Sequence, residues 1–211
     1  MEKKVILASV IIFFLMLAIT SNKLLIINED KLKRDYYELV VAISELFKDH
    51  TQKGEQYYNR SFQSKEEIAD LLNDKVTDSG FDLVIETLFE ENENMYVYRQ
   101  EYQEYLSDTY NFLSQTTNRS YYNTVKDSFL NPALRLINFE ELDVQRIDDK
   151  IVLQGDAILV NFYNEEEGEI KYHQYARYGY PPQDYISLAL TFVYENGNYL
   201  MDHFSVKSIE M

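Results

Sequence analysis

The hydrophobic period of this chain changes once along its length, and that change constrains the fold more than any other feature. Between residues 29 and 49, apolar residues recur at steps of three and four, which is typical of a helix with one buried face. From about residue 134, apolar and polar residues alternate instead, as they do in half-buried strands. Helices followed by antiparallel strands define the α+β class. We therefore expect N-terminal helices packed on a curved antiparallel β-sheet meander.

The dipeptide Asn196-Gly197 is the strongest local signal for that sheet. Asn and Gly tolerate the positive φ angles of a type I′ turn, so a hairpin is expected between strands at 185–194 and 199–209. On the last strand, Leu200, Phe204 and Val206 are expected to share one face. Further strands are expected around 142–144, at 151–163 with a bulge at Gly155, and at 170–178.

Short helices are expected between the first helix and the sheet. Ser64 and Glu67 match a capping box, which predicts a helix over 64–75. After Asp78-Ser79-Gly80, the apolar residues from Phe81 onward suit a helix that ends in Glu90-Glu91-Asn92. The polar segment 51–60 contains Gly54 and is expected to be a loop. The interval 95–130 stays open: Met95–Tyr98 fits a strand, and 102–113 fits a helix or irregular structure.

The N-terminus carries an apolar run, Val5–Ile19, which extends to Ile27 if a polar interruption at 20–23 is included. As a helix, 23 residues would span about 34 Å, enough for the hydrocarbon core of a bilayer. We expect an uncleaved signal-anchor, because Ala18-Ile19-Thr20 is a poor cleavage site. A cleaved signal, which would make the protein secreted, and a buried soluble helix are the alternatives. With an anchor, the protein is a single-pass cell-membrane protein.

The orientation of such an anchor depends on two opposing charge signals. Lys3 and Lys4 favour a cytoplasmic N-terminus, whereas a cluster of basic residues at 23–34 favours a cytoplasmic C-terminal domain. Long translocated domains tend to ignore such counts, so we expect an extracytoplasmic C-terminal domain. The expected organisation is a transmembrane segment at 1–27, an amphipathic helix and loop at 28–57, and an α+β domain at 58–211.

Composition excludes several classes of function. The chain has no cysteine, which rules out disulfide scaffolds, thiolate nucleophiles and Cys-ligated metals. A formal net charge of −16 argues against nucleic acid as a partner, because phosphate binding needs a clustered basic face. The three histidines lack metal-ligand spacing, and no phosphate-binding glycine loop is present. We therefore expect no catalytic residues, no metal and no cofactor.

Tyrosine is the unusual residue of this chain, with 19 copies against no tryptophan. Tyrosine rings offer wide contact at low conformational cost, which suits protein or glycan recognition. Strand propensity, or an AT-rich genome, would also enrich tyrosine. The aromatic and prolyl segment 175–182 is the best candidate for a binding loop. The candidate binding residues are Tyr172, Tyr175, Arg177, Tyr178 and Tyr180.

Three sequence segments resemble known families. The ending E-N-G-N-Y-L-M-D at 195–202 resembles the final hairpin of NTF2-like (cystatin-like cone) domains. The segment Phe62–Glu67 and the acidic turn Glu90–Asn94 also resemble small secreted domains of Gram-positive bacteria, among them inhibitors of cell-wall DL-endopeptidases. The resemblance implies a cone-shaped domain that serves as an assembly module on a membrane stalk, or as an enzyme built in the cone.

Three functions follow as hypotheses. The first is a membrane-tethered, extracytoplasmic interaction or regulatory module of a bacterial cell envelope, whose partner is a basic protein or a cell-envelope enzyme. The second is a small-ligand-binding or enzymatic cone domain, which requires a cavity of a few hundred Å³ with convergent polar groups. The third is an NTF2-like subunit of a secretion or conjugation channel.

Overall fold

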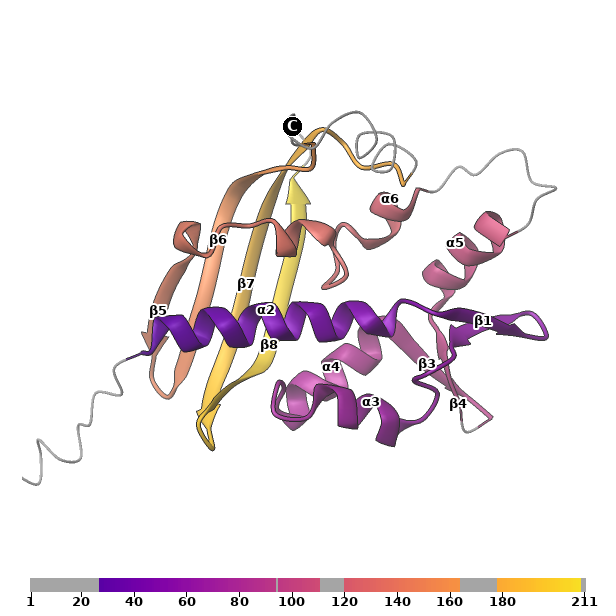
Figure 1. Cartoon of the computed structure of the whole chain (residues 1–211), viewed down its shortest axis with the longest axis horizontal. Helices are drawn as coiled ribbons and strands as arrows, with labels where there is room; N and C mark the ends of the chain where they lie inside the picture. Colours follow the sequence, from indigo (N-terminus) through magenta and orange to yellow (C-terminus); the bar gives the residue numbers. More distant parts are fainter. Residues whose placement is uncertain (1–26, 94, 111–119, 164–177, 210–211) are drawn as a thin grey trace, which may run out of the picture. The chain divides into compact units, whose positions relative to one another are not determined.

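The computed structural model describes residues 27–93, 95–110, 120–163 and 178–209. The chain divides into two compact units, residues 1–30 and Lys31–Met211. Helices and antiparallel sheet are combined within the second unit, which confirms the α+β class (Figure 1). Of the N-terminal span expected at 5–27, all but Ile27 lies outside the described residues. Within the described ranges, no helix combines the length and hydropathy needed to cross a bilayer.

The central sheet has four antiparallel strands in the order β5-β6-β7-β8. They are β5 (Asp143–Ile147), β6 (Lys150–Asn161), β7 (Gln183–Glu195) and β8 (Asn198–Ile209). The turn between β7 and β8 has φ angles of 51° at Asn196 and 88° at Gly197, which confirms the predicted hairpin. The bulge predicted at Gly155 is confirmed, because the β6–β7 register shifts between Gly155 and Ile158. The strand expected at 170–178 lies outside the described residues, apart from Tyr178, which is in a turn.

The last strand contains a second bulge, which the alternation pattern did not predict. Phe192 pairs with Met201 and Thr191 pairs with His203, so Asp202 is the additional residue. The extra residue shifts the alternation: Tyr199 and Met201 are buried before it, and Val206 and Ser208 after it. The expectation that Leu200 shares a face with Phe204 and Val206 is therefore wrong, because the bulge puts Leu200 on the opposite face of the sheet.

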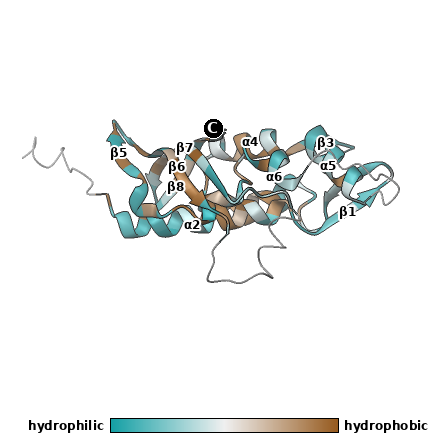
Figure 2. Cartoon of the chain, turned by 90° about the horizontal axis from the view of Figure 1, so that it is seen from above, coloured by the Kyte–Doolittle hydropathy of each residue, from teal (hydrophilic) through white to brown (hydrophobic). Residues whose placement is uncertain are grey.

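The helix α2 (Glu29–Leu46) lies across one face of this sheet (Figure 1). Its buried residues confirm the predicted apolar stripe; they are Leu32, Tyr36, Leu39, Val40, Ala42, Ile43 and Leu46. From the sheet, Leu153, Ile186, Leu190 and Phe192 are fully buried. Figure 2 shows hydrophobic residues gathered between α2 and the sheet, with hydrophilic residues on the opposite side of α2. From Lys31 onward, α2 therefore belongs to the same compact unit as the sheet.

Two short hairpins accompany the helices. The first consists of β1 (His50–Lys53) and β2 (Gln56–Asn59), so the loop expected at 51–60 is wrong. Gly54 supplies the turn with a φ of 64°, and the alternating burial of Tyr57 and Asn59 fixes the strand. The second hairpin consists of β3 (Phe89–Asn92) and β4 (Met95–Tyr98), which confirms the strand at 95–98.

The capping box predicted at the start of the second helix is confirmed. In α3 (Lys65–Leu72), the Ser64 hydroxyl accepts from the Glu67 amide, and the Glu67 carboxylate accepts from the Ser64 amide. The next helix, α4 (Asp78–Leu88), begins earlier than expected because Thr77 caps it, with its side chain accepting from the Gly80 amide. It also ends earlier than expected, since the residues from Phe89 onward pair in β3.

The start of α4 packs closely against the edge strand β8. The Met201 carbonyl accepts from the Thr77 amide at 2.9 Å, and the Met201 amide donates to the Lys75 carbonyl at 2.8 Å. A Cβ atom at Gly80 would lie 2.1 Å from the Met201 carbonyl oxygen. Glycine is therefore required at residue 80 for this close approach.

The remaining elements connect the hairpins to the sheet. They are α5 (Gln100–Tyr110), α6 (Tyr121–Val125), and the 3₁₀ helices η1 (Pro132–Arg135) and η2 (Phe139–Glu141). Two hydroxyl groups of α2 hold the segment around η1: Tyr36 donates to the Leu134 carbonyl and Tyr37 donates to the Ile137 carbonyl, each at 2.8 Å. These bonds place η1 beside the middle of α2, next to the candidate site.

Candidate functional site

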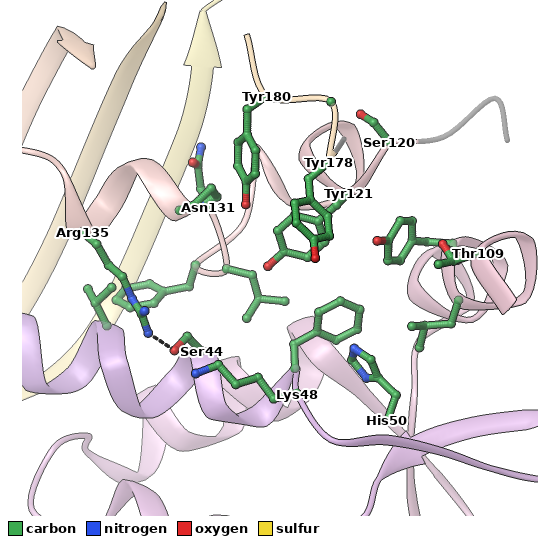
Figure 3. A pocket seen from close by; sticks show the side chains of 18 of the residues that line it. Ser44, Lys48, His50, Thr109, Ser120, Tyr121, Asn131, Arg135, Tyr178 and Tyr180 are labelled. Carbon is green, nitrogen blue, oxygen red and sulfur yellow. Dashed lines mark hydrogen bonds between the residues drawn. The ribbon is translucent and has the colours of Figure 1, made fainter. Parts of the chain in front are cut away.

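A cavity of about 880 Å³ lies within the unit Lys31–Met211. Side chains from the end of α2, from α5, α6 and η1, and from residues 178–180 surround it (Figure 3). Seven phenylalanine and tyrosine residues form much of the described lining: Phe47, Tyr105, Tyr110, Tyr121, Phe129, Tyr178 and Tyr180. A cavity of this size is in the range that binds small molecules or an inserted peptide side chain.

The wall formed by α2 follows from its helical periodicity. Val40 and Ser44 are spaced by four residues, so they project from one side of this helix, and Lys48 follows two residues after the helix ends at Leu46. Phe47, which is 5% exposed, anchors the wall because its ring contacts the rings of Tyr98 and Tyr102 at centroid distances of 4.9 and 5.0 Å. The polar residues Ser44 and Lys48 thus face a cavity whose floor is aromatic.

Tyr121 is the central ring of this lining (Figure 3). Its centroid lies 6.1 Å from that of Phe47, 5.8 Å from Tyr105, 6.2 Å from Tyr178 and 6.1 Å from Tyr180. The backbone keeps these rings together, because the Tyr122 amide donates to the Tyr178 carbonyl at 3.2 Å. The result is a set of ring faces and edges at the distances typical of aromatic contacts.

Arg135 supplies a positive charge to the cavity from η1. The buried Asn131 caps this turn by accepting from the Ala133 amide at 2.9 Å, and its amide group donates to the Lys126 carbonyl at 2.5 Å. The Arg135 guanidinium donates to the Ser44 hydroxyl of α2, as the dashed line in Figure 3 shows. Arg135 therefore lies on a turn that is fixed by hydrogen bonds of Asn131 and of its own side chain.

Burial shifts the pKa of three groups in the lining, and all three are neutral at pH 7. Burial lowers the pKa of His50 to about 4, against the opposing effect of the Asp49 charge. His50 Nδ1 lies 3.2 Å from the Tyr98 hydroxyl, with which it shares a hydrogen bond. Burial raises the pKa of Tyr105 and of Tyr121, so both hydroxyls stay protonated. Neutral hydroxyls can donate and accept hydrogen bonds to a ligand.

The described lining contains Lys48 and Arg135 but neither aspartate nor glutamate. Across the described ranges, no group of three or more His, Asp or Glu residues is arranged to hold a metal ion. This part of the chain also leaves no buried side-chain nitrogen or oxygen without a hydrogen-bond partner. The cavity offers aromatic ring contacts, neutral hydroxyls and a positive charge to a ligand, and this combination suits binding.

The structure places two of the five candidate binding residues in this cavity. Tyr178 and Tyr180 contribute to the lining, whereas Tyr172, Tyr175 and Arg177 lie outside the described residues. Tyr121 and Arg135 are not among the residues predicted from the sequence, because neither stands in a motif and both reach the cavity only through tertiary packing. The capping serine before Tyr121 was the one local signal available, and it indicates a helix start rather than a site.

Comparisons of this chain with family models, with curated proteins and with solved structures find no match.

Proposed function

We propose that this protein is a non-catalytic recognition module of a bacterial cell envelope, tethered by residues 5–27 with its α+β domain on the extracytoplasmic side. The observation that carries the recognition part is the cavity of about 880 Å³ with five tyrosines in its described lining. The apolar run from Val5 supports the tether. The partner is another envelope protein, which inserts a segment into the cavity.

Tyrosine rings suit this role for a physical reason. Each ring offers a large apolar face with only two side-chain torsions to immobilise, and its hydroxyl can bond to a polar partner. Burial keeps the Tyr121 hydroxyl protonated, so it remains a donor at any physiological pH. A partner segment would therefore gain ring contacts and hydrogen bonds at a low entropic cost.

A photo-crosslinking experiment in the native membrane tests recognition at the cavity. A crosslinking amino acid at Thr109, an exposed residue of the lining, is expected to give an adduct with the partner. The same amino acid at Lys207, an exposed residue of β8 that does not line the cavity, is the matched control. Identical adducts from both positions, or none from position 109, would contradict recognition through this cavity.

Protease accessibility tests the tether and its orientation. Protease added to intact protoplasts is expected to degrade the domain and leave a short membrane-bound fragment. Protection of the domain until the membrane is opened would place it in the cytoplasm. Recovery of the full-length chain in the soluble fraction after gentle lysis would remove the tether from the proposal.

A small-ligand-binding domain is the second candidate, favoured by the volume of the cavity. It differs from the first in its test, since a small ligand leaves no protein adduct at position 109 but protects the cavity from chemical labelling. The NTF2-like assignment stays a proposal, supported by the long helix α2 across an antiparallel sheet. With it stays the alternative of a subunit in a secretion or conjugation channel.

A further inference from the structure

We propose that the cavity binds a ring-bearing organic anion, with the anionic group on Arg135 and the ring against Tyr121 and Tyr180. This inference rests on the proposed function, because it names the chemistry that the same cavity recognises. The anionic group is a carboxylate or a phosphate, because each presents a pair of oxygens that a guanidinium can bind with two hydrogen bonds. It can belong to a free small molecule or to the inserted part of a partner.

The charge of the cavity contrasts with the charge of the chain. The chain has 36 acidic and 20 basic residues, and residues 61–110 alone hold 13 acidic residues against three basic ones. The described lining nevertheless contains two cations and no carboxylate. A cavity with low-dielectric walls focuses the field of the charges that line it. An anion is therefore attracted here, whereas most of the surrounding chain repels it.

Arg135 has more hydrogen-bond donors than its described contacts use. Within the described ranges, its guanidinium has one hydrogen-bond partner, the Ser44 hydroxyl, and forms no ion pair. A guanidinium has five N–H donors, so most of them remain for a ligand. Lys48 is different, because its ammonium group already pairs with Glu45 at 2.5 Å. Arg135 is thus the better anchor, because the Glu45 carboxylate offsets the charge of Lys48.

Hydrogen bonds hold the backbone on both sides of Arg135 in position. Tyr36 bonds to the carbonyl of the preceding residue, and Tyr37 bonds to the carbonyl two residues later. The capping side chain of Asn131 holds the start of the same turn. A guanidinium on a held backbone loses less freedom when it binds a bidentate oxygen pair than one on a loose loop does.

The placement of the aromatic rings relative to Arg135 also favours such a ligand. Arg135 and Tyr121 lie close enough for the guanidinium charge to oppose the effect of burial on the Tyr121 hydroxyl. Figure 3 shows Tyr121 and Tyr180 across the cavity from the wall that carries Ser44 and Arg135. A ligand whose anionic group meets Arg135 would direct its body toward these rings, where stacking or edge contacts are available.

Four probes with the same ring test this inference: 2-naphthoate, 2-naphthyl phosphate, the neutral 2-naphthamide and the cationic 2-naphthylmethylammonium. Each is titrated calorimetrically into the full-length chain in nanodiscs of neutral phosphatidylcholine, with empty nanodiscs as the blank. At least one of the two anions is expected to bind about tenfold more tightly than the amide, and the cation is expected to bind most weakly. The two anions compared with each other distinguish carboxylate from phosphate.

Arg135→Gln is the decisive variant, because it removes the charge but keeps a donor near Ser44. It is expected to reduce the preference for the anion over the amide to less than about threefold. Arg146→Gln, at an exposed arginine on β5, removes the same charge away from the cavity and should leave the preference unchanged. Equal thermal unfolding of the two variants shows that both are folded.

The outcomes separate this inference from the proposed function. If the amide binds as tightly as the anions and Tyr121→Leu weakens all of them, the cavity recognises rings but not anions, and only the inference is overturned. An anion preference that survives Arg135→Gln also overturns it, since the anion then lies elsewhere. Absence of binding by all four probes at millimolar concentration counts against both the inference and the aromatic cavity as a recognition site.

Discussion

Replacing Tyr36 by phenylalanine would remove one hydroxyl from the core and leave the ring in place. Tyr36 is fully buried, and its hydroxyl donates to the Leu134 carbonyl at 2.8 Å. Its ring contacts Tyr37 and Phe139 at centroid distances of 5.1 and 6.2 Å. Because phenylalanine preserves these ring contacts, Tyr36→Phe isolates the hydrogen bond that holds α2 to the turn carrying Arg135.

The expected cost follows from the carbonyl that loses its donor. A typical internal hydrogen bond contributes about 1 kcal/mol, but a buried acceptor left without a partner costs about 1–3 kcal/mol. Leu134 is itself fully buried, so water cannot readily replace the hydroxyl. We expect Tyr36→Phe to lower the free energy of unfolding by about 2 kcal/mol. The matched control Tyr37→Phe, at a half-buried residue whose hydroxyl bonds to the Ile137 carbonyl, should cost less than about 1 kcal/mol.

Urea-induced unfolding followed by near-UV circular dichroism measures this difference, since the signal comes from tyrosines in a chain without tryptophan. Equal losses for Tyr36→Phe and Tyr37→Phe, or a loss below about 0.5 kcal/mol for Tyr36→Phe, would refute the reasoning.

The same substitution changes the response to alkaline pH. Burial raises the pKa of Tyr36 above its ordinary value of 10.0. Above pH 10 the unfolded chain therefore releases this proton while the folded chain retains it, and stability falls as the pH rises. Tyr36→Phe removes this contribution, so the variant should lose less stability than the wild type between pH 9 and pH 11.

Three further substitutions test other parts of the structure. Ser64→Ala removes one half of the capping box and should cost about 1 kcal/mol in a urea titration; no loss would mean that the cap does not stabilise α3. Gly80→Ala should cost at least about 2 kcal/mol, because its Cβ would meet the Met201 carbonyl, whereas Ser79→Ala beside it should cost little; similar values would contradict the close approach. His50→Gln removes an imidazole that takes up a proton near pH 6.5 in the unfolded chain but only near pH 4 in the folded chain. The wild type should therefore lose stability relative to this variant as the pH falls from 7 to 4.5. A constant difference between their urea midpoints over this range would show that His50 is not buried as a neutral group.

Local sequence determined those features whose causes lie within a few residues of one another. The capping box needs only Ser64 and Glu67, and the β7–β8 turn needs only two residues that accept positive φ angles. The helical stripe of α2 and the alternation in β6 and β7 likewise follow from neighbouring residues, because each period repeats over a few positions. The α+β class was predictable for this reason.

The bounds of the secondary-structure elements and the buried faces of the strands were less predictable where they depend on pairing between strands. The hairpin at 50–59 was expected to be a loop, since its polar composition hides the burial of Tyr57 and Asn59. The bulge at Asp202 reversed the expected face of Leu200, because the register belongs to the pair of strands and not to β8 alone.

The candidate site belongs almost wholly to the tertiary structure. Ser44 and Arg135 are 91 residues apart and meet through one hydrogen bond, and Tyr121 reaches Tyr178 across a similarly non-local contact. A tyrosine-rich composition indicated recognition and placed Tyr178 and Tyr180 among the candidates, but it could not select Tyr121 from the other tyrosines. A cavity exists only where separate elements pack around a common space, so its shape and its charge depend on how α2, α6 and η1 are brought together and not on the residues adjacent to each side chain.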